Sequence, residues 1–268
     1  MGATTRGTNN EPIAFRGSGR LLDAGGAAWI LACGLGVAGF GASLLAVREG
    51  PGALATETTL ATLVGLLEAI VLGLGSLLLA LAGRTIGRDA TALWARAHGP
   101  EAWRSLDDLT SHGRRASWSF TAFGGTTFVS AIAFATVVAN PASTIALEGV
   151  VVASVVAIVG SVVLLHAALH LAAVLRWLRR HVLDRTAERP LLNLRTYAIL
   201  NLMGSIVVGI PLVLAAAGRY PSLARDACVL VGGSVLSAVI VPLVGAMVFF
   251  DVVRTGLSIR HPSGMGAR

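Results

Sequence analysis

Six stretches of the chain are long and apolar enough to cross a membrane as α-helices: residues 27–47, 60–82, 118–139, 147–175, 197–217 and 227–252. A membrane helix needs about 20 mainly apolar residues. Apolar side chains occupy every side of each stretch, as in lipid-embedded helices, and none alternates like a membrane barrel strand. The pattern predicts an all-α membrane protein, a six-transmembrane-helix bundle built from three helical hairpins.

The composition agrees with this fold class. Charged residues make up 13% of the chain and hydrophobic residues 54%, whereas a soluble domain carries about 25% charged residues. The mean hydropathy is +0.75. Too few polar side chains remain to cover a water-facing surface, so we expect a membrane domain with short connections and no separate catalytic domain.

The arginines predict the orientation of the helices. Segments 1–26, 83–117, 176–196 and 253–268 hold eighteen of the 21 basic residues, and the three alternate segments hold the other three. This positive-inside pattern places both termini in the cytoplasm. All basic residues are arginine, and the chain has no Lys or Gln, which indicates a GC-rich bacterial genome and therefore the plasma (inner) membrane. Because topology accounts for the charge, we expect no nucleic-acid partner.

The chain divides into three predicted regions. Segment 1–26 is polar and expected to be disordered in the cytoplasm. Segment 27–252 forms the transmembrane domain, with a cytoplasmic amphipathic segment at 83–117 that breaks into two helical pieces at Gly99–Pro100. Segment 253–268 is a cytoplasmic tail. Tryptophans at the cytoplasmic ends of the spans are expected to be interfacial anchors, namely Trp29, Trp118 and Trp177.

Small residues four apart predict where helices pack closely, since lipid supplies no hydrophobic drive between them. Gly34, Ala38 and Ala42 form such a ridge on the first predicted helix.

Glu68 is an isolated acid inside the second apolar stretch. A charged carboxylate costs several kcal/mol in that environment, so it should be protonated, hydrated or paired. An intramembrane acid is a functional candidate, and a neutral hydrogen-bonded glutamate is the alternative.

His166 and His170 are four residues apart and share one face of the fourth helix. That spacing can chelate a metal or haem, but metal-binding helices of this kind add an acid and a third ligand, which are missing here. By depth, Asn201 and Asp251 lie at a similar level. These four residues predict a polar cavity in the inner leaflet, and no metal site is assigned with them.

No sequence motif identifies a catalytic residue or a cofactor, so we expect no cofactor and no enzyme activity. Chain length, topology and the segment at 83–117 are similar to the membrane subunits of some ATP-driven exporters. This resemblance implies a transport-type, permease-like subunit without its own energy source, in contact with the lipid bilayer and with a cytoplasmic ATPase or other membrane subunits. Two alternatives stay open: a haem- or metal-binding redox subunit using His166 and His170, and a non-catalytic scaffold or assembly subunit.

Overall fold

The computed structural model describes residues 15–49, 54–94, 100–139, 144–183, 193–218 and 235–260. Apart from a few residues at the helix ends, these residues are helical, and they contain no strand. The elements are α2 (Arg16–Glu49), α3 (Leu54–Trp94), α4 (Pro100–Ala139), α5 (Thr144–His181), α6 (Leu194–Ala216), the π-helical turn η1 (Leu236–Ile240) and α8 (Val241–Arg260).

Six helical segments are long and apolar enough to cross a membrane. They are Arg16–Ala42, Thr62–Ala92, Arg104–Val137, Leu147–His181, Leu194–Ala216 and Leu236–Arg260. The predicted all-α bundle with six membrane-length helices is therefore confirmed. Insertion into a membrane, and the direction of that insertion, remain predictions.

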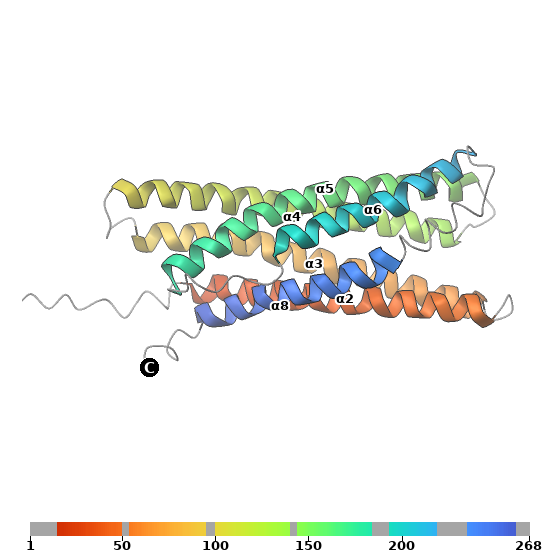
Figure 1. The fold of residues 1–268 in the computed structure, drawn as a ribbon, viewed down its shortest axis with the longest axis horizontal. Coiled ribbons are helices and arrows are strands. Elements are labelled where there is room, and N and C mark those ends of the chain that lie inside the picture. Colours follow the sequence, from red (N-terminus) through yellow and green to blue (C-terminus); the bar gives the residue numbers. More distant parts are fainter. Residues whose placement is uncertain are drawn as a thin grey trace, which may run out of the picture.

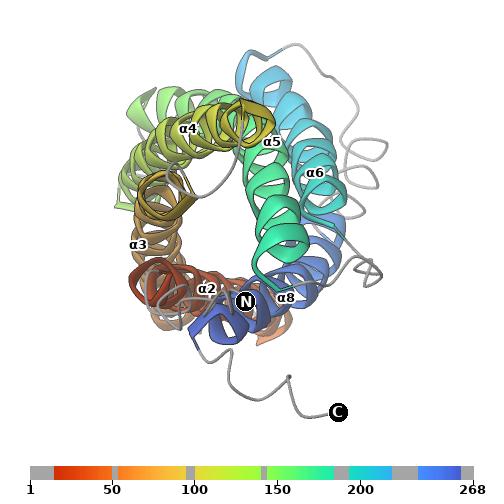
Figure 2. The same cartoon turned by 90° about the vertical axis from the view of Figure 1, so that its left-hand side faces the viewer.

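The helices form a ring in the order α2, α3, α4, α5, α6, α8, as the view along the bundle shows (Figure 2). The ring closes where α8 packs along α2, so the first and last helices are neighbours. The start of α2 and the end of α8 lie at the same end of the bundle (Figure 1), which we call the terminal end. The contact between α6 and α8 is much shorter than the other contacts around the ring.

The first helix begins earlier than its hydropathy indicates. Segment 1–26, predicted to be disordered, is helical from Arg16 onward, while residues 1–14 lie outside the described part of the chain. Tertiary contacts hold this extension: Ser18 Oγ donates to Asp89 at 3.0 Å, and Arg260 pairs with Asp23 at 2.7 Å. For the same reason α8 continues to Arg260, past the predicted end at residue 252.

The predicted amphipathic segment 83–117 extends α3 and α4 instead of forming separate short helices. α3 runs to Trp94, and α4 starts at Pro100, where the missing N–H of proline costs nothing. Leu106 and Leu109 are buried in this extension. Figure 1 shows that α3 and α4 project beyond the other helices at the terminal end. The side chains of Trp94 and Trp103 lie outside the described residues.

Glycines bring α3 and α4 into backbone contact. A Cβ added to Gly83 would lie 2.8 Å from the carbonyl oxygen of Gly113, and a Cβ on Gly113 would collide with the carbonyl of Gly83. The predicted ridge on the first helix is not used this way, since Gly34 and Ala38 are exposed and nothing approaches Gly34 within 4 Å. Spacing alone identified a small-residue ridge but not the side of the helix that packs.

The core is aromatic, and Trp29 lies at its centre instead of anchoring the interface as predicted. Its ring is 4.4 Å from Phe249 and 5.5 Å from Phe123, and stacks on both. Trp118, by contrast, is 64% exposed, with the guanidinium of Arg84 5.7 Å from its ring centroid. Of these two tryptophans, Trp118 has the surroundings of an interfacial anchor. Trp177, the third predicted anchor, is half-buried and donates to Ser105 Oγ at 2.8 Å.

Candidate functional site: an arginine-lined cavity

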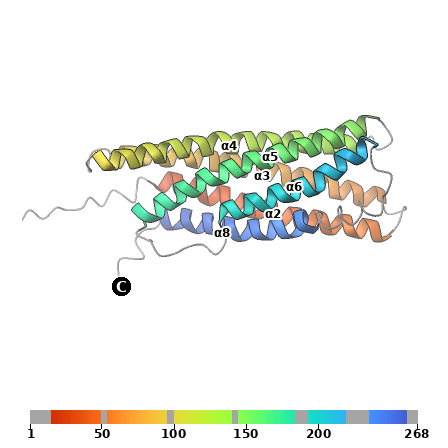
Figure 3. The same ribbon diagram turned by 45° about the horizontal axis from the view of Figure 1, so that its top comes forward.

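A cavity lies beside the first residues of α6, because the two helices that flank α6 extend further toward the terminal end. α6 starts at Leu194, after an N-cap at Asn193 whose side chain accepts a hydrogen bond from the Thr196 backbone N–H at 2.9 Å. α5 continues to His181 and α8 to Arg260, so both pass the start of α6 toward the terminal end (Figure 3). The short sixth helix leaves space between its neighbours.

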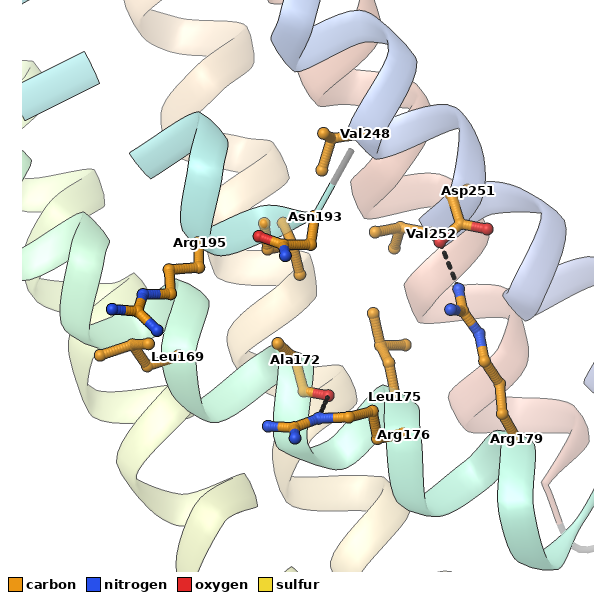
Figure 4. A pocket seen from close by; sticks show the side chains of 11 residues that line it. Leu169, Ala172, Leu175, Arg176, Arg179, Asn193, Arg195, Val248, Asp251 and Val252 are labelled. Atoms are coloured by element: carbon orange, nitrogen blue, oxygen red, sulfur yellow. Dashed lines mark hydrogen bonds and ion pairs between the residues drawn. The ribbon is translucent and has the colours of Figure 1, made fainter. Parts of the chain in front are cut away.

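The cavity has a volume of about 430 Å³. One part of its lining is aliphatic and the other is polar, with side chains from α5, α6 and α8 (Figure 4). The aliphatic residues are Leu169, Ala172, Leu175, Leu194, Val248 and Val252. The polar residues are Arg176, Arg179, Asn193, Arg195 and Asp251. The lining therefore contains three guanidinium groups and one carboxylate.

Arg179 and Asp251 form an ion pair that links α5 to α8 (Figure 4). The same guanidinium donates to Thr255 Oγ at 3.0 Å. The two charged side chains are 14% and 32% exposed, so each needs a partner to offset its loss of hydration. The charge of Asp251 is thus matched within the protein.

Arg176 and Arg195 are the two arginines of the cavity lining that do not pair with Asp251. Nε of Arg176 donates a hydrogen bond to the carbonyl oxygen of Ala172 at 3.3 Å. Arg195 is exposed and forms no side-chain hydrogen bond or ion pair with the residues that the structure describes. Figure 4 shows both on the side of the cavity away from the Arg179–Asp251 pair. Among the residues that the structure describes, no carboxylate balances the positive charge on that side of the cavity.

The predicted inner-leaflet polar cavity is divided among three places. Asp251 lines the cavity just described. Asn201 lies between α5 and α6, where its amide oxygen accepts from Ser161 Oγ at 2.7 Å. His166 and His170 lie on the side of α5 that meets α4. The structure does not bring these four residues together.

The two histidines belong to a chain of three imidazoles. Nδ1 of His170 is 2.7 Å from Nδ1 of His112 on α4, and its Nε2 is 3.1 Å from Nε2 of His166. Nδ1 of His166 is 2.7 Å from Ser119 Oγ, which donates to the carbonyl oxygen of Arg115. Since the single hydroxyl proton of Ser119 is used there, His166 donates to the serine. With three neutral rings, His170 then donates to His166 and His112 to His170.

This arrangement does not converge on one metal position. Both ring nitrogens of His170 face different imidazoles, and among the described residues no group of three or more His, Cys, Asp or Glu side chains is placed to hold a metal ion. His166 is exposed on the outside of the bundle. The histidines link α4 to α5 by hydrogen bonds.

Glu68 lines a second, smaller cavity of about 250 Å³ between α3, α4 and α5. Two hydroxyl side chains, Thr127 and Ser130, share that lining. A Cβ on Gly36 of α2 would lie 2.8 Å from the Glu68 carboxylate, so the acid packs directly against α2 at this glycine. Cys33 and Tyr197 meet nearby, both packed against Gly245. Cys228 lies outside the described residues.

Sequence reasoning missed the residues that give the main cavity its charge. Arg176 and Arg195 fall in a segment whose arginines are explained by topology, and a hydropathy profile gives no sign that two of them face a space between helices. His112 was missed because its partner, His170, lies 58 positions away in the sequence. Treating α4 and α5 as an antiparallel hairpin would have placed His112 opposite His170.

Comparison of the chain with protein-family models, with curated proteins and with solved structures found no match.

Proposed function

We propose that this chain is a transport-type membrane protein whose cavity between α5, α6 and α8 binds an anionic substrate. The observation that carries the proposal is the pair Arg176 and Arg195, whose charge Asp251 does not neutralise because Arg179 already occupies it. Guanidinium groups at the edge of an apolar space attract carboxylates and phosphates more strongly than in bulk water. The volume of about 430 Å³ suits a small molecule or part of a larger one.

The energy source is proposed to come from a partner. The projection of α3 and α4 at the terminal end supports docking of a cytoplasmic ATPase or another membrane subunit there. This partner is proposed by analogy of architecture with ATP-driven exporters. Isolation in mild detergent, followed by identification of proteins bound in stoichiometric amount, tests it, with removal of residues 95–99 expected to reduce the bound fraction.

The proposal includes an orientation, with the cavity facing the cytoplasm of a bacterial cell. Reporter tags at either terminus should be cytoplasmic, and a tag between residues 140 and 146 should be external, because the arginines alternate in that sense. Accessibility of the terminal tags from outside intact cells would reverse the direction of the cavity.

Anion binding by the purified protein tests the function itself. Titration with inorganic phosphate and with sulfate should give saturable binding, and Arg176→Gln with Arg195→Gln should weaken it at least about tenfold, since charged hydrogen bonds contribute about 1.5–3 kcal/mol each. The matched control is Arg114→Gln with Arg180→Gln, two exposed arginines outside the cavity, which should bind as the unmodified protein does. Absence of saturable binding would refute the proposal and favour a scaffold role.

One observation favours the redox alternative: His112 adds a third imidazole to His166 and His170. A metal or haem at these residues would give an absorbance band or stoichiometric metal in the purified protein. We rank this second, because the three rings are joined in a row and do not surround one point.

A further inference from the structure

We infer that the ligand of the arginine-lined cavity is a phosphate-bearing amphiphile, with its phosphate at Arg176 and Arg195 and its apolar part along the wall formed by Leu169, Ala172, Leu175, Val248 and Val252. This inference rests on the proposed anion-binding function and names the class of substrate for the same site.

The head-group side follows from the geometry of the two arginines. A guanidinium offers paired donors whose spacing matches two oxygens of a phosphate. Within the described part of the chain, the terminal nitrogens of Arg176 have no hydrogen-bond partner, and its Nε donates to the Ala172 carbonyl oxygen. Arg195, on a different helix, lines the same cavity. Two guanidiniums from separate elements suit a group with several acceptor oxygens better than a single carboxylate.

The tail side follows from the aliphatic lining. A fully hydrated anion would gain nothing from Leu169, Leu175 and Val248, whereas an alkyl chain buries its methylenes against them. Leu169 is 42% exposed while lining the cavity, so the aliphatic wall reaches the outer surface of the bundle. An acyl chain can therefore extend from the cavity toward the surrounding lipid.

The level of the arginines also favours a lipid. Arg176 directly follows the predicted span 147–175, and Arg195 lies just before the predicted span 197–217. Both arginines are thus at the predicted boundary between hydrocarbon and head groups. Basic pockets between membrane helices on the cytoplasmic side are suited to anionic lipid head groups. A soluble phosphate ester has the same phosphate group but no alkyl chain to pack against the aliphatic lining of the cavity.

Calorimetric titration of the full-length protein in a neutral detergent separates these sources. The probes are dihexanoyl phosphatidylglycerol, dihexanoyl phosphatidylcholine with the same tails, glycerol 3-phosphate and inorganic phosphate. The phosphatidylglycerol should bind at least about tenfold more tightly than either soluble phosphate or the phosphatidylcholine, because only it uses both halves of the cavity.

Two variant pairs assign the halves. Arg176→Gln with Arg195→Gln should weaken phosphatidylglycerol and inorganic phosphate alike, at least about tenfold. Leu169→Ser should weaken phosphatidylglycerol and leave inorganic phosphate unchanged. Val162→Ser, at another exposed position on α5 that does not line the cavity, is its control and should change neither. If the double arginine variant does not fold, Arg195→Gln alone replaces it.

Equal affinity for phosphatidylglycerol and inorganic phosphate would overturn the amphiphile while leaving the proposed anion-binding function intact. Equal affinity for both phospholipids would also overturn the amphiphile, since binding would then be adsorption of tails. Absence of binding by every anionic probe would overturn both the inference and the proposed function.

Discussion

Two contacts in the ring of helices are built in opposite ways. Between α3 and α4, Gly83 and Gly113 place one backbone against the other, with no room for a single carbon atom. Between α6 and α8 the contact is short. The cavity with its charged lining lies beside the start of α6, where α5 and α8 continue toward the terminal end without it. Packing in a membrane depends on such close approach. We infer that the close α3–α4 contact stabilises the bundle, and that ligand binding uses the place where the packing between helices is interrupted.

The largest expected effect is at the close contact. Gly113→Leu should lower the free energy of unfolding by more than about 3 kcal/mol, because its side chain meets backbone that cannot move aside. Gly125→Leu is the control on the same helix, with nothing within 4 Å, and should change stability by less than about 0.5 kcal/mol. Thermal and denaturant unfolding in detergent measures both, and equal stability of the two variants would mean that the contact does not stabilise the bundle.

A substitution in the cavity beside α6 and α8 should lower stability and strengthen anion binding at the same time. Asp251→Asn leaves Arg179 without its counter-charge, and we expect a loss of about 1–3 kcal/mol, below that of a fully buried pair because both groups are partly exposed. Titration with inorganic phosphate should at the same time show tighter binding, since a negative charge has left the cavity. Weaker binding would contradict the assignment of Asp251 as internal partner of Arg179.

Glu68 tests whether the second cavity also has a function. Glu68→Gln keeps the size of the side chain, so we expect an unchanged unfolding temperature and a transport rate altered by about tenfold, as an acid costly to bury is expected to be used. Uptake of the best-binding anion into proteoliposomes measures the rate. Glu148→Gln, on the exposed side of α5, is the control. Normal transport by Glu68→Leu would make the acid incidental.

The smallest effects are expected at the histidines. His170→Ala removes two hydrogen bonds and should lower stability by about 1 kcal/mol, whereas His166→Ala, at an exposed position, should have less effect. The purified protein should be colourless and contain no stoichiometric metal. An absorbance band lost in both variants, or zinc or copper at one equivalent, would instead support the redox alternative.

The six helices could be predicted because membrane-length apolar runs are a local property of the sequence. Helix ends could not be predicted as well: Arg16–Gly26 is helical because Phe15 and Leu22 are buried and Asp23 meets Arg260, contacts that join opposite ends of the chain. Glu68 and Asp251 were identified as candidates because acids are rare in such segments. Arg176 and Arg195 were not, since many arginines share their segment and only the late start of α6 distinguishes them.

Closure of the ring by α8 on α2 has a consequence for how the protein is made. α8 is translated long after α2 but covers it at Gly19, Gly26 and Gly256, so the glycine side of α2 stays uncovered until α8 has been made. The Asp23–Arg260 pair can form only after Arg260 has been synthesised, so the two ends of the ring are joined late in translation, although α2 is the first of these helices to be made.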